Sequence, residues 1–243
     1  MVDVKGKWAF LTGGSRGIGR LEALYLAERG CNLIIHARKK EHAEEVLKEV
    51  RAFGVEAMAV EAELSDLASV ERMLEEIDRT GIPVDILLNN AGMQIAYRTD
   101  YLKTPAEDYT VSFLVNTTAP MMILYHFLPG MIKRGFGRVV NTTSGIALEP
   151  EQAGYSASKA ALSKVTVDLG SKLEGSDVLI NLTDPGWCRT DLGGPYAPND
   201  PESALPGVLV GVFVDDGRCG RNLAAGYFYN MTMEEAVKRA DSL

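Results

Sequence analysis

The feature that most constrains the fold of this chain is a regular alternation between short apolar runs and longer amphipathic segments. The runs have the length of strands, and the segments between them carry apolar residues at helical spacing. The expected strands are Lys7–Thr12, Asn32–Ala37, Glu56–Glu61, Asp85–Asn89, Gly137–Thr142 and Val178–Thr183. The expected helices are Gly17–Arg29, Glu41–Phe53, Asp66–Thr80, Ala106–Arg134 and Gly154–Leu173. Nearly continuous apolar strands between helices predict an α/β fold, with a doubly wound parallel sheet covered on both faces.

The end of the chain follows this rhythm less closely. Gly226–Tyr229 is short and aromatic, and it is expected to form a seventh strand, while Met233–Ala240 is expected to form a terminal helix. The proline-rich segment Gly193–Pro206 is expected to be a loop that covers the substrate. Pro120 predicts a kink or break within the fourth helix. The 243 residues carry no linker or repeat, so residues 1–243 are expected to form a single domain.

Composition excludes several classes of function. With 25 Lys and Arg against 33 Asp and Glu, the net charge of -8 argues against nucleic acid and anionic membranes as partners. No apolar run reaches the ~20 residues that cross a bilayer, and the first residues lack a signal-peptide layout. The 3 cysteines and 3 histidines form no metal-binding pattern, so we expect no metal and a cytoplasmic location.

A glycine-rich turn lies between the first expected strand and the first expected helix, at Thr12–Gly19. Glycines there allow a close approach to a pyrophosphate, and the helix N-terminus supplies free N–H groups, although a tight turn alone also favours glycine. NAD-binding folds hold the ribose with a carboxylate directly after the second strand. This chain has no carboxylate at that turn. Arg38 stands there instead, with Lys39 and Lys40, and Arg16 lies within the turn. The pattern favours NADP(H), the alternative being a solvated charge run that opens a helix.

Tyr155 and Lys159 lie four residues apart near the start of an expected helix, so both project from one face. A free tyrosine has a pKa of ~10 and is a poor base near neutrality. A nearby ammonium group favours the phenolate, so the pair could exchange a proton with an alcohol or a carbonyl oxygen. The spacing is common by chance, and other residues must support it.

Further motifs accompany the glycine turn Thr12–Gly19 and the Tyr155–Lys159 pair: Asn89–Gly92 after the fourth expected strand, Asn116, Ser144, Pro185–Gly186 and Thr190. In this order and at these element boundaries, the set resembles the short-chain dehydrogenase/reductase family, in its compact single-domain branch. The resemblance implies a Rossmann-like three-layer sandwich of about seven strands and an NADP(H)-dependent oxidoreductase. The residues that carry it or that it assigns to the cofactor are Gly13, Ser15, Arg16, Gly17, Ile18, Gly19, Arg38, Glu63, Leu64, Asn90, Ala91, Gly92, Tyr155, Lys159, Pro185, Gly186 and Thr190. Glu63 departs from the family's usual Asp beside the adenine.

The resemblance also implies catalytic roles for Asn116, Ser144, Tyr155 and Lys159. Tyr155 would be the general acid or base, and Lys159 would lower its pKa and hold the nicotinamide ribose. Ser144 would bind the substrate oxygen, although the neighbouring hydroxyl of Thr142 or Thr143 could serve instead. Asn116 would position a water that connects Lys159 to solvent.

Three functions remain open from the sequence. The leading one is interconversion of a carbonyl and a secondary alcohol on a small molecule. A narrower one is reduction of 3-oxoacyl groups on an acyl carrier protein, whose acidic surface would need basic residues such as Lys133, Arg134 and Lys172. The third is a catalytically silent NADP-binding regulator. Expected substrate-pocket residues are Gln94, Ile95, Ala96, Tyr97, Ile146, Leu148, Glu149 and Tyr196, and Trp187 and Cys188 are expected to be packing residues. By analogy with the family, the chain forms a homo-oligomer, a dimer or tetramer.

Overall fold

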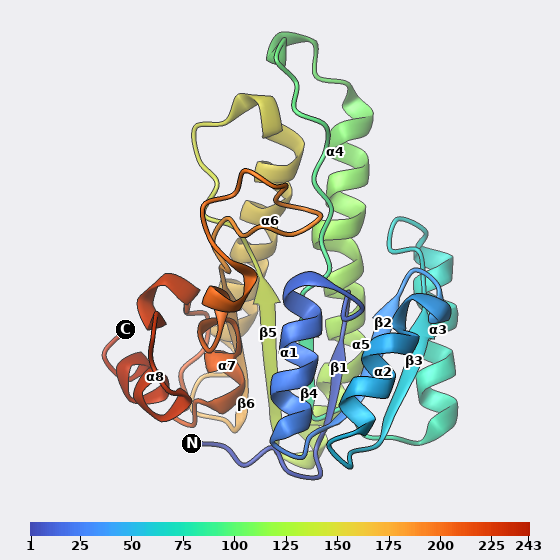
Figure 1. Cartoon of the computed structure of the whole chain (residues 1–243), viewed down its shortest axis with the longest axis vertical. Coiled ribbons are helices and arrows are strands. Elements are labelled where there is room, and N and C mark those ends of the chain that lie inside the picture. The colour runs from blue at the N-terminus through green and yellow to red at the C-terminus, as the bar shows by residue number, and fades with distance from the viewer.

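The six expected apolar runs form six strands of one parallel sheet in the computed structural model, which describes residues 1–243 (Figure 1). The strands are β1 (Trp8–Leu11), β2 (Asn32–Ala37), β3 (Ala57–Glu61), β4 (Ile86–Asn89), β5 (Gly137–Thr142) and β6 (Val178–Thr183). Their order is β3-β2-β1-β4-β5-β6, so the direction of winding reverses between β1 and β4. The doubly wound α/β fold is therefore confirmed, with six strands rather than seven. A reversal of this kind opens a crevice at the carboxyl ends of the strands.

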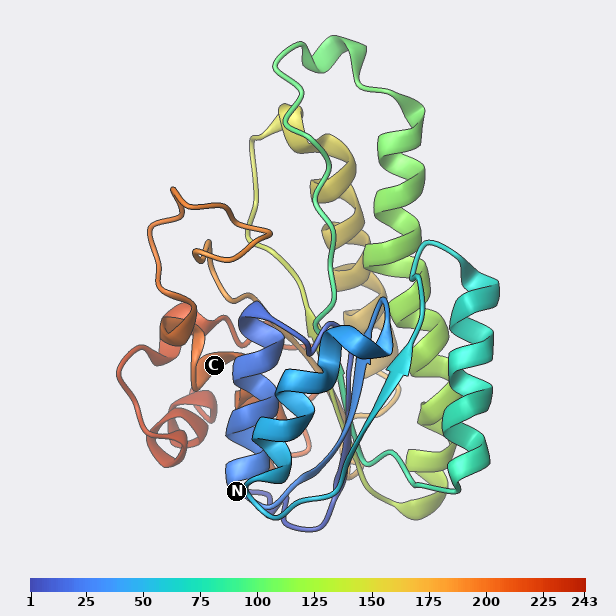
Figure 2. The same ribbon diagram turned by 45° about the vertical axis from the view of Figure 1, so that its right-hand side comes forward.

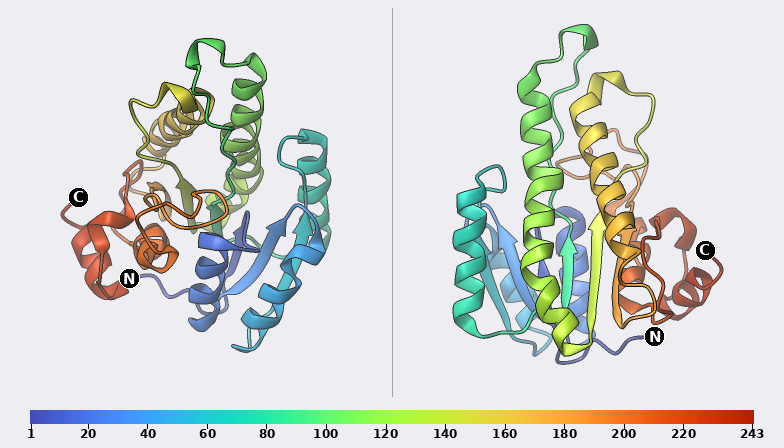
Figure 3. Two further views of the ribbon diagram at one scale, coloured as in Figure 1. Left: turned by 45° about the horizontal axis from the view of Figure 1, so that its top comes forward. Right: turned by 180° about the vertical axis from the view of Figure 1, so that it is seen from behind.

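Helices cover both faces of the sheet (Figures 2 and 3). One face carries α1 (Gly17–Glu28), α2 (Glu44–Arg51) and α7 (Val210–Phe213), with α8 (Met233–Ala240) packed beside α7. The other carries α3 (Leu67–Thr80), α5 (Ala119–Arg134) and α6 (Ala153–Gly170). Because side chains alternate along a strand, Leu33 and Ile35 enter the first core while Ile34 enters the second. This double burial explains why the strands are apolar throughout.

Two expected helices begin or continue differently from the sequence prediction. Residues 40–43 form a 3₁₀ turn before α2, so the α-helix starts at Glu44. The long helix consists of α4 (Ala106–Phe113), a π-helical turn at Leu114–Thr118, and α5. Pro120 cannot donate the usual backbone hydrogen bond, and the wider turn just before it accommodates this without a break.

By length and composition alone, the stretch that contains α4 and α5 could cross a membrane. Its apolar side chains instead pack against the sheet and α3, and 56% of the most apolar window is buried within the protein. A buried core helix accounts for this composition. The compartment remains a prediction.

The expected seventh strand at Gly226–Tyr229 is wrong. Ala225–Phe228 form a 3₁₀ turn, and residues 220–225 lie along the edge of β6 instead. Their backbone bonds include Gly220 N to Ile180 O at 2.8 Å and Ala225 N to Asp184 O at 2.8 Å. Since β6 ends at Thr183, the segment that follows Ala225 has no strand left to pair with. Phe228 turns into the core and is fully buried.

Candidate active site

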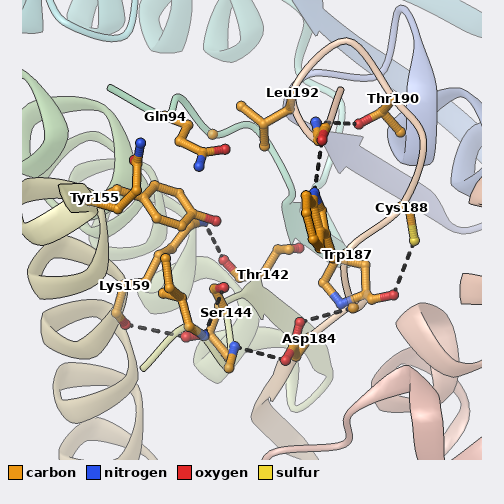
Figure 4. Close-up of a pocket in the computed structure, with 18 of the residues that line it drawn as sticks. Gln94, Thr142, Ser144, Tyr155, Lys159, Asp184, Trp187, Cys188, Thr190 and Leu192 are labelled. Atoms are coloured by element: carbon orange, nitrogen blue, oxygen red, sulfur yellow. Dashed lines mark hydrogen bonds between the residues drawn. The ribbon is translucent and has the colours of Figure 1, made fainter. Parts of the chain in front are cut away.

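A cavity of about 1060 Å³ lies at the carboxyl ends of the strands, and Figure 4 shows part of its lining. It receives residues from the segments that follow β4, β5 and β6, and from the start of α1. The predicted site residues that line it are Ile18, Asn90, Gly92, Ser144, Tyr155, Lys159, Pro185, Gly186 and Thr190. The structure thus places Ile18, at the α1 end of the glycine turn, around one space with the tyrosine and the lysine. The other predicted site residues do not line the cavity. They are Gly13, Ser15, Arg16, Gly17, Gly19, Arg38, Glu63, Leu64, Ala91 and Asn116.

The glycine turn fits a dinucleotide cofactor because the backbone approaches itself closely there. A Cβ at Gly19 would lie 2.3 Å from the carbonyl oxygen of Gly13 and 2.6 Å from Asn90 Nδ2. Asn90 Nδ2 donates to Thr12 O at 3.1 Å, and Ala91 N donates to Thr12 Oγ1 at 3.0 Å. No side chain caps the first turn of α1, so its free N–H groups are available to a phosphate.

The basic residues expected around a 2′-phosphate have different surroundings. Arg38 is exposed at the end of β2, and no ion pair occupies its guanidinium. Arg16 forms an ion pair with Asp191 at 2.6 Å, across the cleft from the glycine turn to the loop after β6. The Glu61 carboxylate also lies beside these basic residues, which the sequence did not predict. Its Oε2 accepts from Lys40 N at 3.1 Å.

The adenine side of the expected site is bounded by residues that follow β3. The Glu63 carboxylate accepts from Ser65 N at 3.1 Å and from Ser65 Oγ at 2.9 Å, so it is held in a local turn. Leu64 is buried. The longer side chain at position 63 is therefore tied to its own loop.

Tyr155 and Lys159 enter the cavity from the first turns of α6, as Figure 4 shows. Lys159 is 3% exposed, and its Nζ donates to Thr142 O at 2.6 Å. Burial lowers the pKa of Lys159 to about 8, against an opposing effect from Asp184. Burial raises the pKa of Tyr155, while a hydrogen bond with Ser144 lowers it and Asp184 raises it further.

Lys159 is not among the groups that shift the Tyr155 pKa in this structure, and its role toward the phenol stays a prediction. The ammonium group is directed at the Thr142 carbonyl, and burial dominates the phenol. Burial therefore disfavours the phenolate, and Tyr155 is a protonated phenol at neutral pH.

Asp184 is a site residue that the sequence reading missed. It follows β6 and lines the cavity, where its Oδ2 accepts from Gly145 N at 2.8 Å and its Oδ1 from Gly186 N at 2.9 Å. One carboxylate thus connects the turn that carries Ser144 to the Pro185–Gly186 loop. Its position directly before Pro185 was the available signal, because residues at the carboxyl end of a parallel strand face the crevice.

Asn116 lies in the π-helical turn and its side chain is fully engaged. Its Oδ1 accepts from Met93 N at 2.9 Å, and its Nδ2 donates to Met93 O at 2.9 Å and to Ser158 Oγ at 3.0 Å. The side chain thereby fastens the segment after β4 to α6. The expected role of Asn116 toward a relay water stays a prediction.

The substrate side of the cavity contains most, but not all, of the expected residues. Gln94, Ile95, Tyr97, Ile146 and Glu149 line it, whereas Ala96, Leu148 and Tyr196 do not. Leu148 and Tyr196 are 99% and 91% exposed, because both lie on outward turns of their loops. Trp187 is not a core packing residue: it is 59% exposed, lines the cavity, and donates from Nε1 to Gly193 O at 2.8 Å.

The geometry agrees with comparisons to known proteins. A family model described as short chain dehydrogenase matches residues 7–200. The chain belongs to the short-chain dehydrogenase/reductase family. A short chain dehydrogenase of Pseudocercospora fijiensis is 30% identical over 97% of this chain and 85% of its own length. A 3-oxoacyl-[acyl-carrier-protein] reductase of Aquifex aeolicus is 35% identical over 79% of this chain and 77% of its own.

Solved structures of the family superpose closely on this chain. A 3-oxoacyl (acyl-carrier-protein) reductase from Agrobacterium tumefaciens with NADP bound has a TM-score of 0.80 at 26% identity, covering 91% of this chain and 93% of that one. An NAD+-bound xylitol dehydrogenase has a TM-score of 0.80 at 26% identity, covering 92% and 98%. As a short-chain dehydrogenase/reductase, this protein is an oxidoreductase that uses a nicotinamide dinucleotide and a small-molecule substrate.

Replacing Lys159 with Met is expected to stabilise the folded protein at pH 7. A shift of the pKa from 10.5 to about 8 corresponds to ~3 kcal/mol of unfavourable burial, and losing the bond to Thr142 costs about 1 kcal/mol, which leaves a net gain of about 2 kcal/mol. Because the folded-state pKa is lowered, the penalty is fully present below pH 8 and disappears as the pH rises toward 10.5. Urea unfolding across this range measures the gain.

The control for this prediction is Lys164→Met, which removes a lysine that is 71% exposed from the same helix. Its effect on the free energy of unfolding should be small and should not follow this pH dependence. A Lys159→Met protein that is less stable than the wild type at every pH would contradict the assignment of a strained buried ammonium.

Proposed function

We propose that this protein is an NADP(H)-dependent oxidoreductase that interconverts a carbonyl and a secondary alcohol on a small molecule. The observation that carries the proposal is the shared cavity: the Tyr155 phenol, the Lys159 ammonium and the α1 end of the glycine turn all border it. When bound, the nicotinamide cofactor supplies or accepts the hydride.

In reduction, the substrate carbonyl oxygen needs a proton and a hydrogen-bond donor. Tyr155 supplies the proton, since a phenol is in its protonated form at neutral pH. Ser144, which hydrogen-bonds the phenol, orients the same oxygen. Lys159 replaces the proton that leaves the buried site, and it would hold the nicotinamide ribose. In oxidation, the same groups act in the reverse direction. Pro185, Gly186 and Thr190 contact the nicotinamide end of the cofactor, while Gly13–Gly19 hold the pyrophosphate.

A small substrate is favoured over an acyl carrier protein by the distribution of charge. Arg134, at the C-terminus of α5, donates to Val84 O just before β4. This contact lies at the amino ends of the strands, opposite the cavity. Lys133 precedes Arg134, and Lys172 follows the C-terminus of α6 at the same end of the strands. The cavity itself is lined by the acidic side chains Glu149, Asp184 and Asp191, which would repel an acidic partner. The basic patch expected for that partner is therefore on the wrong side.

A preference for NADP(H) over NAD(H) is supported by the exposed Arg38 at the end of β2, where a fork of donors matches a phosphate. Of the two solved structures named above, one holds NADP and the other holds NAD+, so the family allows both.

The proposed reaction is tested by Tyr155→Phe. Loss of the proton donor should lower kcat by about 10²- to 10⁴-fold with any active aldehyde or ketone, monitored by NADPH absorbance. NADPH affinity, measured by its fluorescence, should change less than about threefold, since the hydroxyl does not carry the pyrophosphate. Tyr101→Phe, at a tyrosine 48% exposed, is the control. Undiminished turnover in Tyr155→Phe would refute the assigned role.

The cofactor preference is tested by Arg38→Asp. Removing a charged contact with the 2′-phosphate should reduce the ratio of kcat/KM for NADPH to that for NADH by about 10- to 100-fold. Lys39→Asp makes the same charge change at the next exposed residue and should leave most of the preference intact. A wild-type enzyme that uses NADH as efficiently as NADPH would overturn the assignment.

We also propose that the protein self-associates through the outer faces of α5 and α6. Tyr125 and Ile132 on α5 are 54% and 52% exposed, and Val167 on α6 is 45% exposed. Apolar side chains of this size favour a protein contact when they gather on neighbouring helices. Light scattering should give a dimer or tetramer, and Tyr125→Glu with Val167→Glu should yield monomers; a monomeric wild type would contradict the proposal.

A further inference from the structure

The glycine turn contains a backbone donor that the sheet cannot satisfy. The pairing of β1 with β2 ends at Leu11 and Ile35, so the N–H of Gly13 lies beyond the ladder. His36 accepts it instead: Gly13 N lies 3.2 Å from His36 Nδ1, and Gly14 N donates to His36 O at 3.1 Å. Any residue would supply the second bond through its main chain. Only a side chain with an acceptor at the Nδ1 position supplies the first.

The other nitrogen of the His36 ring contacts a third segment. Nε2 lies 3.1 Å from the carbonyl oxygen of Ala62, which follows β3. A carbonyl accepts only, so Nε2 carries the proton and Nδ1 is free to accept from Gly13. The ring is 2% exposed and fixed at both nitrogens. It therefore connects the turn that faces the pyrophosphate to the segment that leads to Glu63 and Leu64, on the adenine side.

We propose that His36, as a neutral imidazole, is a positioning residue for the dinucleotide: it holds the glycine turn in its binding conformation and fixes its distance from the segment after β3. This inference rests on the proposed function, in which a nicotinamide dinucleotide lies against that turn. His36 acts through Gly13 and Ala62 and does not touch the reacting atoms. Asn and Gln side chains also carry acceptors, but only the ring reaches both segments with one acceptor and one donor.

Protonation of the ring would remove this connection. An imidazolium donates from both nitrogens, so it cannot accept the Gly13 N–H. Burial lowers the pKa of His36, with smaller opposing effects from Ala62 O and from Glu63, the charged group that faces it from the turn after β3. Leu11 at the end of β1 and Thr12 directly after it carry no charge, and Arg16 in the glycine turn is paired with Asp191. The neutral form is thus kept at pH 7, and the turn should loosen only at a pH below the ordinary pKa of histidine.

Two substitutions distinguish the effect of the acceptor at the Nδ1 position from that of the His36 ring as a whole. His36→Asn places an amide oxygen near the position of Nδ1 without a titratable group, whereas His36→Leu removes the acceptor. At pH 8, we expect His36→Leu to raise the Kd for NADPH about tenfold or more, because a buried N–H loses its partner. His36→Asn should give a Kd between those of the wild type and His36→Leu, because it keeps an acceptor for Gly13 but does not reach Ala62. At saturating cofactor, kcat should change little in either variant.

The pH profile gives a readout that a merely structural role would not move. As the pH falls from 8 to 5, the Kd for NADPH of the wild type should rise more steeply than that of His36→Asn. Dividing the wild-type Kd by the His36→Asn Kd at each pH removes the effect of titration of the cofactor and of other groups. His126→Asn, at a partly exposed histidine that pairs with Asp78, is the matched control and should follow the wild type. ¹⁵N NMR of the wild-type ring at pH 7 should show the Nε2–H tautomer.

Three results would overturn the inference: an Nδ1–H tautomer, a His36→Asn profile that coincides with that of the wild type, or unchanged NADPH affinity in a folded His36→Leu. If His36→Leu fails to fold, as judged by circular dichroism, His36→Asn and the NMR measurement still decide. Failure of the proposed function is distinguishable, because a wild type that bound neither NADPH nor NADH would fail before any substitution was compared.

Discussion

The close contact between the first turn of α1 and the end of β1 is the constraint on which the rest of the site depends. Gly19 leaves no room for a Cβ beside the Gly13 carbonyl, so the helix begins directly against the strand. This places the uncapped N–H groups of α1 at the point where the sheet reverses its winding. Asn90, directly after β4, fastens the same turn from the other side of the reversal. Without this approach, the helix N-terminus and the cavity would not share a boundary.

The reaction centre is built from groups that would be better solvated elsewhere. Lys159 is buried as an ammonium with a single carbonyl partner, and Tyr155 is buried next to the negative charge of Asp184. Both effects disfavour the charged form of their group, so the pair starts from a protonated phenol and an easily deprotonated amine. Such an arrangement is unfavourable for folding and useful for proton transfer. It persists because α6, the strand ends and Asp184 hold their backbones in place from several directions.

The sequence predicted the elements whose cause is local and missed those whose partner lies far along the chain. The six strands were predictable because burial on both faces makes each one apolar throughout, as in β2. Gly226–Tyr229 has the composition of a strand, but the edge of β6 is occupied by residues 220–225, which carry glycine and arginine and gave no strand signal. His36 and Asp184 were overlooked for the same reason. His36 bonds to Gly13, 23 residues away, and Asp184 bonds to Gly145, 39 residues away, and sequence spacing does not reveal such contacts. The position of Asp184 after β6 indicated only that it faces the crevice.

By itself, the sequence determined the order of strands and helices, the glycine turn, and the presence of Tyr155 and Lys159 at helical spacing. These follow from periodicity, backbone freedom and side-chain chemistry, which neighbouring residues fix. Only the tertiary structure decided that the α1 end of the glycine turn and the Tyr155–Lys159 pair border one cavity, that Lys159 points at Thr142, and that the basic residues near α5 lie at the opposite end of the strands. Those outcomes depend on which strand ends meet and on how deeply each charge is buried, and both are properties of the packed chain.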